Sequence, residues 1–373
     1  MESIDGPRVP SQNERYTEQP ADRPTIGLEA TVQSQADVQS TNSASATGRR
    51  SGTAPPASSR LSPLLKDIAK RYMVVFALLA LIIAFSVLKP ATFFTSGNLA
   101  TILTTQAALL VVAVTLAIAL AAGEFDLSIA GTIGFCGILV AHLSANLRIP
   151  LSVSVLVVLV IGILIGLTNS LFVVYFRVSS FIVTLALGTL LTGAALGISG
   201  SSTISNLPEG FAILMQHRFL GVGLPFWYAA VIVALCWFLL EQTPFGRYLF
   251  FTGEGREAAA LAGVRVNKVR VISLVVSAVG AAFAGIVLVG QTGAADASFG
   301  DSYLLEAFAA AFLGAATIKA GRFNILGAVV AVFLLSVGTT GLQLFGLANW
   351  VTNVFEGAVL IAAVTFAGLF DRK

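Results

Sequence analysis

The chain has 373 residues, of which 56% are hydrophobic and only 11% charged, and its mean hydropathy is +0.87. So few charged side chains cannot cover a soluble surface, which excludes a soluble enzyme, a nucleic-acid-binding protein and a protein with a single membrane anchor. Seventeen of the 41 charged residues lie in residues 1–71, which leaves 24 for the following 302 residues.

Residues 1–71 are predicted to be a disordered cytoplasmic tail. They are rich in Ser, Thr, Gln, Ala and Pro and contain few Leu, Ile or Phe, so they cannot bury enough apolar surface to offset chain entropy. The first apolar stretch begins near Tyr72, too far along the chain for a secretory signal peptide, so we expect no cleavage there. Arg49 and Arg50 are interpreted as scattered solvated charge and not as a recognition patch.

Residues 72–373 are predicted to form an all-α, polytopic transmembrane domain. At about 20 residues for each span and about 10 for each loop, this length allows on the order of ten crossings. Ten apolar runs bounded by Pro, Gly and charges are present, at 72–88, 99–122, 127–146, 151–176, 180–199, 224–240, 270–291, 302–318, 323–346 and 350–369.

The distribution of basic residues predicts the orientation. An even number of spans puts both termini on one side, and that side carries most of the Lys and Arg residues outside the spans. The opposite side carries only Lys89, Arg148 and Arg218. Since cytoplasmic loops collect Lys and Arg, we expect both termini in the cytoplasm and the protein in the plasma membrane.

Small residues within the spans are interpreted as packing positions. Membrane helices associate closely where glycine lets their backbones approach, as at Gly162 with Gly166 and at Gly193 with Gly197. Cys136 and Cys236 fall inside spans, where a small apolar role is expected in place of a disulfide.

The connection 241–270, on the predicted cytoplasmic side, is unusual for a loop. Residues 256–262 are strong helix formers that begin after Gly255 and end at Gly263, where glycine suits a left-handed cap. A short helix rich in alanine has little side chain in the way and can lodge in a groove on another protein. A plain connector between spans is the alternative.

Several motifs in this order resemble one family. The segments 243–248 (TPFGRY) and 257–264 (EAAALAGV) resemble the coupling segment of permease subunits of ABC importers, in the ribose-type sugar branch. The segments 123–131 (GEFDLSIAG) and 180–188 (SFIVTLALG) resemble two further signatures of that branch. The segments 320–327 (AGRFNILG) and 341–346 (GLQLFG) match it as well, so the likeness covers roughly residues 90–370.

The resemblance implies a permease subunit that moves a monosaccharide or related polyol inward by alternating access. Its implied partners are a cytoplasmic ABC ATPase that hydrolyses the ATP, an external sugar-binding protein, and a second permease copy or paralogue. The chain shows no phosphate-binding Gly-x-x-x-x-Gly-Lys-Ser/Thr loop, so it has no visible means of holding the phosphates of ATP. We expect no enzymatic activity, cofactor, metal or nucleic acid on this chain. The residues implied to couple to the ATPase are Gly246, Arg247, Glu257, Ala258, Ala259 and Gly263.

Gly123 and several polar residues in the apolar region are candidates for the translocation path or for helix capping. The polar candidates are Asp126, Ser128, Asn169, Glu306, Gln343 and Glu356. Their side chains either meet solute hydroxyls or tie helices together, because lipid satisfies no polar group. For Asp126, capping of a helix that starts at Leu127 or Ser128 is favoured over contact with sugar.

Two positions, Glu124 and Glu356, depart from the family pattern. Glu124 stands where the signature commonly has a second glycine, and a carboxylate costs at least about 2.5 kcal/mol at the bilayer centre, so it should face protein or water. Glu356 stands where relatives often have a basic residue, which puts any inherited role there in doubt.

Two rival functions fit parts of the sequence. A secondary transporter driven by an ion gradient also explains ten spans with a few buried carboxylates, but it has no ATPase to receive a cytoplasmic helix. An intramembrane serine protease would use Ser199 of the Gly197–Gly200 segment with His142 or His217 as the base. Metal-dependent hydrolysis is weaker still, because two isolated histidines give no zinc-binding pattern.

Overall fold

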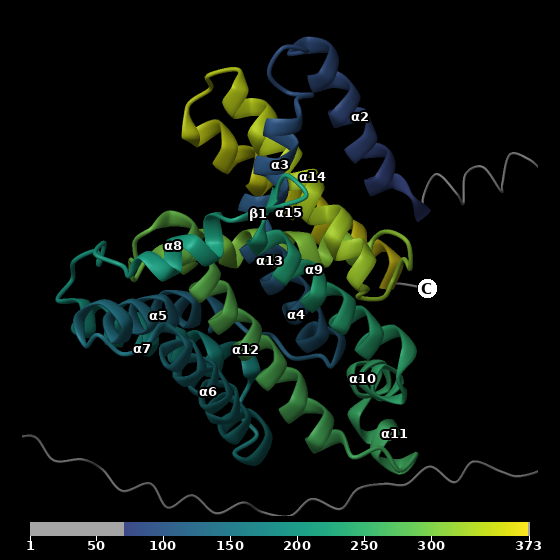
Figure 1. The fold of residues 1–373 in the computed structure, drawn as a ribbon. Coiled ribbons are helices and arrows are strands. Elements are labelled where there is room, and N and C mark those ends of the chain that lie inside the picture. The colour runs from purple at the N-terminus through teal and green to yellow at the C-terminus, as the bar shows by residue number, and fades with distance from the viewer. Residues whose placement is uncertain (1–70, 372–373) are drawn as a thin grey trace, which may run out of the picture. The chain divides into compact units, whose positions relative to one another are not determined.

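The computed structural model describes residues 71–371, so the predicted tail lies outside the described residues except for Arg71. Nearly all regular structure in this part is helical (Figure 1). The α helices are α2 (Met73–Leu88), α3 (Ser96–Thr105), α4 (Ala107–Ala121), α5 (Ile129–Ala141), α6 (Leu151–Ser170), α7 (Ser180–Ser199), α8 (Glu209–Gln216), α9 (Leu224–Trp237), α10 (Pro244–Glu254), α11 (Arg256–Leu261), α12 (Val266–Thr292), α13 (Phe299–Ala315), α14 (Ile325–Leu344) and α15 (Asn349–Asp371). π-helical turns extend three of them: η1 (His142–Asn146), η2 (Leu171–Tyr175) and η3 (Phe238–Gln242). Strands β1 (Arg218–Phe219) and β2 (Val222–Gly223) form an antiparallel hairpin.

Six of these helices, counted with their π-helical turns, are long and apolar enough to cross a membrane. A seventh span results if α3 and α4, which are bent by 44°, are one broken span. Helix α2 and residues 350–365 of α15 are shorter apolar helices. The all-α, multi-pass architecture expected from the sequence is therefore confirmed, while the number of ten spans and their orientation stay predictions.

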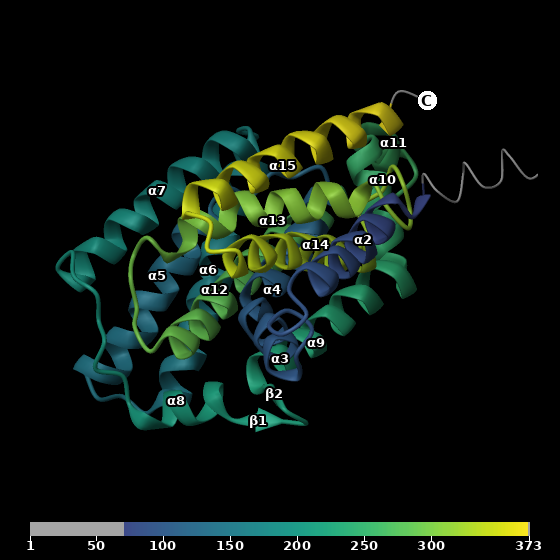
Figure 2. The same cartoon turned by 90° about the horizontal axis from the view of Figure 1, so that it is seen from above.

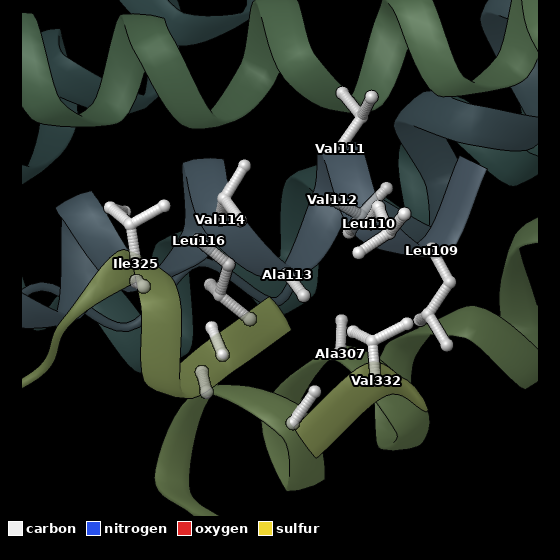
Figure 3. Close-up of a cluster of buried hydrophobic side chains, with 14 of the residues drawn as sticks. Leu109, Leu110, Val111, Val112, Ala113, Val114, Leu116, Ala307, Ile325 and Val332 are labelled. Carbon is white, nitrogen blue, oxygen red and sulfur yellow. The ribbon is translucent and has the colours of Figure 1, made fainter. Parts of the chain in front are cut away.

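Helix α4 is the centre of one group of helices, and all fifteen of its residues are buried. It packs against α9, α12, α13 and α14. Figure 3 shows its side chains, such as Leu109 and Leu116, beside Ala307 of α13 and Ile325 and Val332 of α14. A helix that is apolar on every face needs neighbours on every face, and here protein supplies them.

Helix α12 joins this group to a second one formed by α5, α6 and α7 (Figure 2). A Cβ atom added at Gly166 of α6 would lie 2.5 Å from Val275 Cα of α12, and one added at Gly162 would lie 2.8 Å from Ala282 Cβ. The two helices touch through their backbones, which confirms the predicted packing at Gly162 and Gly166.

The second predicted glycine pair does not pack in this way. A Cβ atom at Gly193 or Gly197 of α7 would meet nothing within 4 Å, so the prediction is wrong for the described residues of this chain. The spacing of the glycines cannot tell which face of a helix has a neighbour. Cys136 and Cys236 are both buried and free, as expected for small apolar side chains.

The connection between α7 and α9 is fastened to the loop between α12 and α13. Ile204 and Ala295 form an isolated antiparallel bridge, and the Thr203 hydroxyl donates to Asp296 Oδ2 at 2.8 Å. The amide and hydroxyl of Ser298 donate to Asp296 Oδ1 at 3.0 and 2.7 Å. These hydrogen bonds favour the ionised carboxylate and hold the pKa of Asp296 below its usual value.

The α6–α12 contact gives a test of the fold. We expect Gly166→Ala to destabilise the detergent-solubilised protein by about 1–3 kcal/mol, because the added methyl group collides with the α12 backbone. Gly193→Ala is the matched control and should raise stability by about 0.5–1 kcal/mol, since alanine is the better helix former. Thermal unfolding midpoints compare the two variants, and equal midpoints would contradict the contact.

Candidate functional site

The segment 241–270 folds into two short helices, α10 and α11, which lie beside the start of α12 (Figure 1). The predicted helix over residues 256–262 is present as α11, and Gly263 after it has the left-handed φ of +81° that its role as a cap requires. Helix α10 was not predicted. It begins at Pro244, which suits this position. Backbone amides in the first turn of a helix have no acceptor within the helix, so nothing is lost when proline has no amide hydrogen.

The structure divides the six coupling candidates into two groups. Arg247, Glu257, Ala258 and Gly263 are exposed and form the part of this segment that a partner can reach. Gly246 and Ala259 are buried, and a Cβ atom at Gly246 would lie 1.8 Å from the Leu240 carbonyl oxygen. Gly246 and Ala259 are therefore packing positions of α10 and α11 within this chain, and a partner protein cannot reach them directly.

Every ion pair among the described residues has one partner in the segment 241–270. Lys319 pairs with Glu241, and Arg322 pairs with Glu254 at 3.4 Å. Glu124, which has no exposed side-chain surface, accepts from Arg256 at 2.9 Å and from Arg270 at 2.5 Å. The segment is thus fastened to the α4–α5 connection on one side and to the α13–α14 loop on the other.

Two sequence motifs that are far apart in the chain lie against each other. In the α4–α5 connection, the Phe125 amide donates to Ser180 Oγ at 3.2 Å, and the Leu127 amide donates to Thr184 Oγ1 at 2.9 Å. A Cβ atom at Gly131 would lie 2.1 Å from the Gly188 carbonyl oxygen, so α5 and α7 touch through their backbones. The roles of Ser180 and Thr184 were missed, and the only signal was a pair of hydroxyl residues four apart at the start of an apolar run.

Asp126, Ser128 and Asn169 form one buried hydrogen-bonded chain. The amide and hydroxyl of Ser128 donate to Asp126 Oδ1 at 3.0 and 2.5 Å, just before α5 begins at Ile129. The Asn169 side-chain amide donates to Ser128 Oγ at 2.8 Å, which ties α6 to the start of α5. Asp126 therefore closes a turn just before α5 and does not cap the helix, whose N-cap is Ser128 without a side-chain cap hydrogen bond, because α5 begins one or two residues later than expected.

Part of this chain has no hydrogen-bond partner. Asp126 Oδ2 and Asn169 Oδ1 are both buried and unpaired, as is the hydroxyl of Ser277 in α12. Burial raises the pKa of the Asp126 carboxyl above its ordinary value, against the opposing effect of the Ser128 hydrogen bonds.

The remaining path candidates lie elsewhere. Glu306 of α13 and Glu356 of α15 are half-buried on helices that pack together. Gln343 is exposed near the end of α14, and Gly123 is exposed with a φ of +74°. The structure therefore does not gather all seven candidates into one site.

The protease arrangement is not assembled in the described part of the chain. The Ser199 hydroxyl donates weakly to the Leu196 carbonyl oxygen at 3.4 Å, and the His142 ring meets the Asn146 side chain at 3.1 Å. His217 is exposed. Among residues 71–371, no group of three or more His, Cys, Asp and Glu residues is placed to hold a metal ion.

The motif 320–327 is organised by Asn324, which was not among the predicted site residues. Its side chain accepts from the Gly327 amide at 2.7 Å and donates to the carbonyl oxygens of Gly314 and Thr317 at 2.9 and 3.1 Å. Asn324 thus caps α14 and fixes the loop from which Lys319 and Arg322 reach the segment 241–270.

Two clefts lie near opposite ends of α12. One of about 900 Å³ adjoins the ion pairs and is lined by Glu124, Arg177, Arg256, Asn267 and Arg270 among others. The other, of about 480 Å³, is lined mainly by hydroxyl, amide and guanidinium groups, from Thr101, Thr104, Thr105, Gln216, Arg218 and Gln291. Side chains of this kind donate and accept hydrogen bonds, as a polyol requires.

From the hydrogen bonds between Asp126 and Ser128 we expect different outcomes for two substitutions of Asp126. Asp126→Asn keeps the oxygen that accepts from Ser128 and removes a buried charge, so we expect unchanged or higher stability. Asp126→Leu leaves the Ser128 amide and hydroxyl unpaired and should cost about 1–3 kcal/mol. Thermal unfolding in detergent distinguishes them. Equal destabilisation by both variants would show that the charge, and not the hydrogen bonds, holds the connection.

Comparison with known proteins agrees with this arrangement. Residues 98–364 match the family described as "Branched-chain amino acid transport system / permease component". The chain is 28% identical to the ribose import permease protein RbsC of Haemophilus influenzae over 292 residues, which is 77% of this chain and 90% of that protein. It is 30% identical to the autoinducer 2 import system permease protein LsrD of Salmonella paratyphi B over 260 residues, 68% of this chain and 78% of that protein. No solved structure matches the chain.

These matches confirm the resemblance on which the sequence motifs converge. The family match covers more than half of the chain, and it includes the α4–α5 connection, both short helices and the Asn324 loop. The protein therefore belongs to this family of permease components and is a membrane-embedded permease subunit of an ATP-binding-cassette importer.

Proposed function

We propose that the protein imports a monosaccharide or related polyol, driven by ATP hydrolysis in a partner subunit. The observation that carries this proposal is the exposed face of α11, with Glu257, Ala258 and Gly263, on a segment fastened by ion pairs to the membrane helices. An ATPase that binds this face can displace the membrane helices to which the segment is joined. The similarity to permeases named for ribose and autoinducer 2 supports a small polar solute.

The proposal includes ten spans with both termini in the cytoplasm. Besides the six long helices, α2, the bent pair α3–α4, α13 and α15 would each cross once. The concentration of Lys and Arg around α10, α11 and the α13–α14 loop supports a cytoplasmic position for that end. The cleft beside Thr101 and Gln291 then opens on the outer side, where hydroxyl and amide groups can receive a polyol.

The proposed partners follow from this arrangement. A cytoplasmic ABC ATPase binds the exposed side of α10 and α11, an external binding protein delivers the solute, and a second permease copy or a paralogue completes the assembly. The ATP-bound and nucleotide-free forms of the ATPase would each favour a different arrangement of the spans, as alternating access requires.

The test is reconstitution of the chain with its co-purified ATPase and binding protein in liposomes. We expect ATP-dependent uptake of at least one solute from a panel of D-ribose, D-xylose, D-galactose and myo-inositol. Uptake that persists without ATP and collapses with the proton or sodium gradient would favour the secondary transporter. Uptake of none of the panel would contradict the proposed solute class.

Gly263 gives a sharper test of the coupling segment. Gly263→Pro cannot adopt the observed φ of +81° and loses the amide that donates to the Ala260 carbonyl oxygen at 3.0 Å, so we expect it to abolish uptake. Gly263→Asn is the matched control, because asparagine tolerates the left-handed region, and it should retain uptake. Membrane level is measured for both. Normal transport by the correctly inserted proline variant would contradict the coupling assignment.

A further inference from the structure

Glu124 joins the segment 241–270 to the α4–α5 connection, which also carries the buried Asp126. Its carboxylate has no exposed surface, and Oε1 accepts from Arg256 of α11 and from Arg270 of α12. Two residues further along the same connection, Asp126 begins the chain through Ser128 to Asn169 of α6. Only one short stretch of backbone separates the two sets of contacts.

Backbone contacts reinforce this meeting point. A Cβ atom added at Gly253 of α10 would lie 2.4 Å from the Ala121 carbonyl oxygen, so α10 presses directly on the end of α4. Arg256 also donates to the Gly123 carbonyl oxygen at 3.4 Å, and Arg270 donates to the Val173 carbonyl oxygen at the same distance. Helices α10, α11 and α12 therefore all contact the α4–α5 connection.

The two arginines differ in their surroundings. The Arg270 side chain is 9% exposed, so its pair with Glu124 neutralises a charge that water cannot reach. The Arg256 side chain is 49% exposed and lies on the small helix that a partner can reach. Loss of Arg256 leaves Glu124 paired with Arg270, whereas loss of Glu124 leaves the buried Arg270 without an ion-pair partner.

We propose that Glu124, which accepts hydrogen bonds from Arg270 and Arg256, is a positioning residue. When α11 is displaced, Glu124 transmits the movement to the Asp126–Ser128–Asn169 chain between the membrane helices. This inference rests on the proposed function, since it presumes an ATPase that displaces α11.

The experiment compares Arg256→Gln with Arg322→Gln in the complete reconstituted importer. Both substitutions remove a half-exposed arginine that pairs with a glutamate at this end of the molecule, but only Arg256 reaches the α4–α5 connection. The measured quantity is the ATP hydrolysed for each molecule of solute imported, using the fastest-imported sugar of the panel. Thermal unfolding midpoints establish that both variants are folded.

We expect Arg256→Gln to raise the ATP consumed for each imported molecule about tenfold, a size typical of coupling between two sites. Arg322→Gln should leave the ratio unchanged, and Arg256→Lys, which restores the charge, should lower it again towards that of the unaltered chain. A purely structural role would lower ATP hydrolysis and uptake together and leave the ratio constant.

Three results would overturn the inference: an unchanged ratio in Arg256→Gln, an equal rise in both glutamine variants, or no recovery in Arg256→Lys. Should Arg256→Gln fail to fold, Arg256→Lys and Glu124→Asp, which keep both charges at altered length, replace it and should raise the ratio to a smaller extent. Failure of the proposed function looks different, because the unaltered chain itself would then show no ATP-dependent uptake.

Discussion

The connection between α4 and α5 must satisfy its own backbone, and much of the structure around it follows from that requirement. Four of its amides donate to four different acceptors: the Ala119 carbonyl for Glu124, Ser180 Oγ for Phe125, Thr184 Oγ1 for Leu127 and Asp126 Oδ1 for Ser128. Lipid supplies no hydrogen bonds, so irregular backbone within a membrane protein persists only where protein supplies them. Helix α7 must lie beside this connection, and the glycine contact between α5 and α7 lets it come close enough.

The placement of charge obeys the same constraint. Carboxylates and arginines are rare in the apolar region, and the ion pairs of the described residues gather where the segment 241–270 meets the membrane helices. Two arginines neutralise the fully buried Glu124 carboxylate and hydrogen-bond its Oε1, while Oε2 is buried without a partner. The same charges that make burial possible also join α11 and α12 to one short connection.

Local sequence patterns predicted most of the helices, but they could not predict contacts between residues that lie far apart in the sequence. The apolar runs gave the helices, and the alanine run between Gly255 and Gly263 gave α11. The pairing of Glu124 with Arg270 joins residues 146 positions apart, and no local pattern signals it. Helix α10 was missed because its glycines and aromatic residues form helix poorly alone, while packing against α4 and α12 stabilises it here. The prediction that Gly193 packs against another helix was wrong because a helix can carry a packing motif on a face that has no neighbour in the same chain.

The exposed fractions of the paired side chains indicate how easily a conformational change can break each ion pair. Arg322 and Glu254 are 58% and 65% exposed, so water can replace either partner at little cost. Separating Arg270 from Glu124 would instead leave two charges without solvation. If α10 and α11 are displaced relative to the membrane helices, we therefore expect the Arg322–Glu254 pair to break first, while the Arg270–Glu124 pair keeps the start of α12 joined to the α4–α5 connection. The half-exposed Arg256 lies between these two pairs in exposure, with 49% of its side chain exposed.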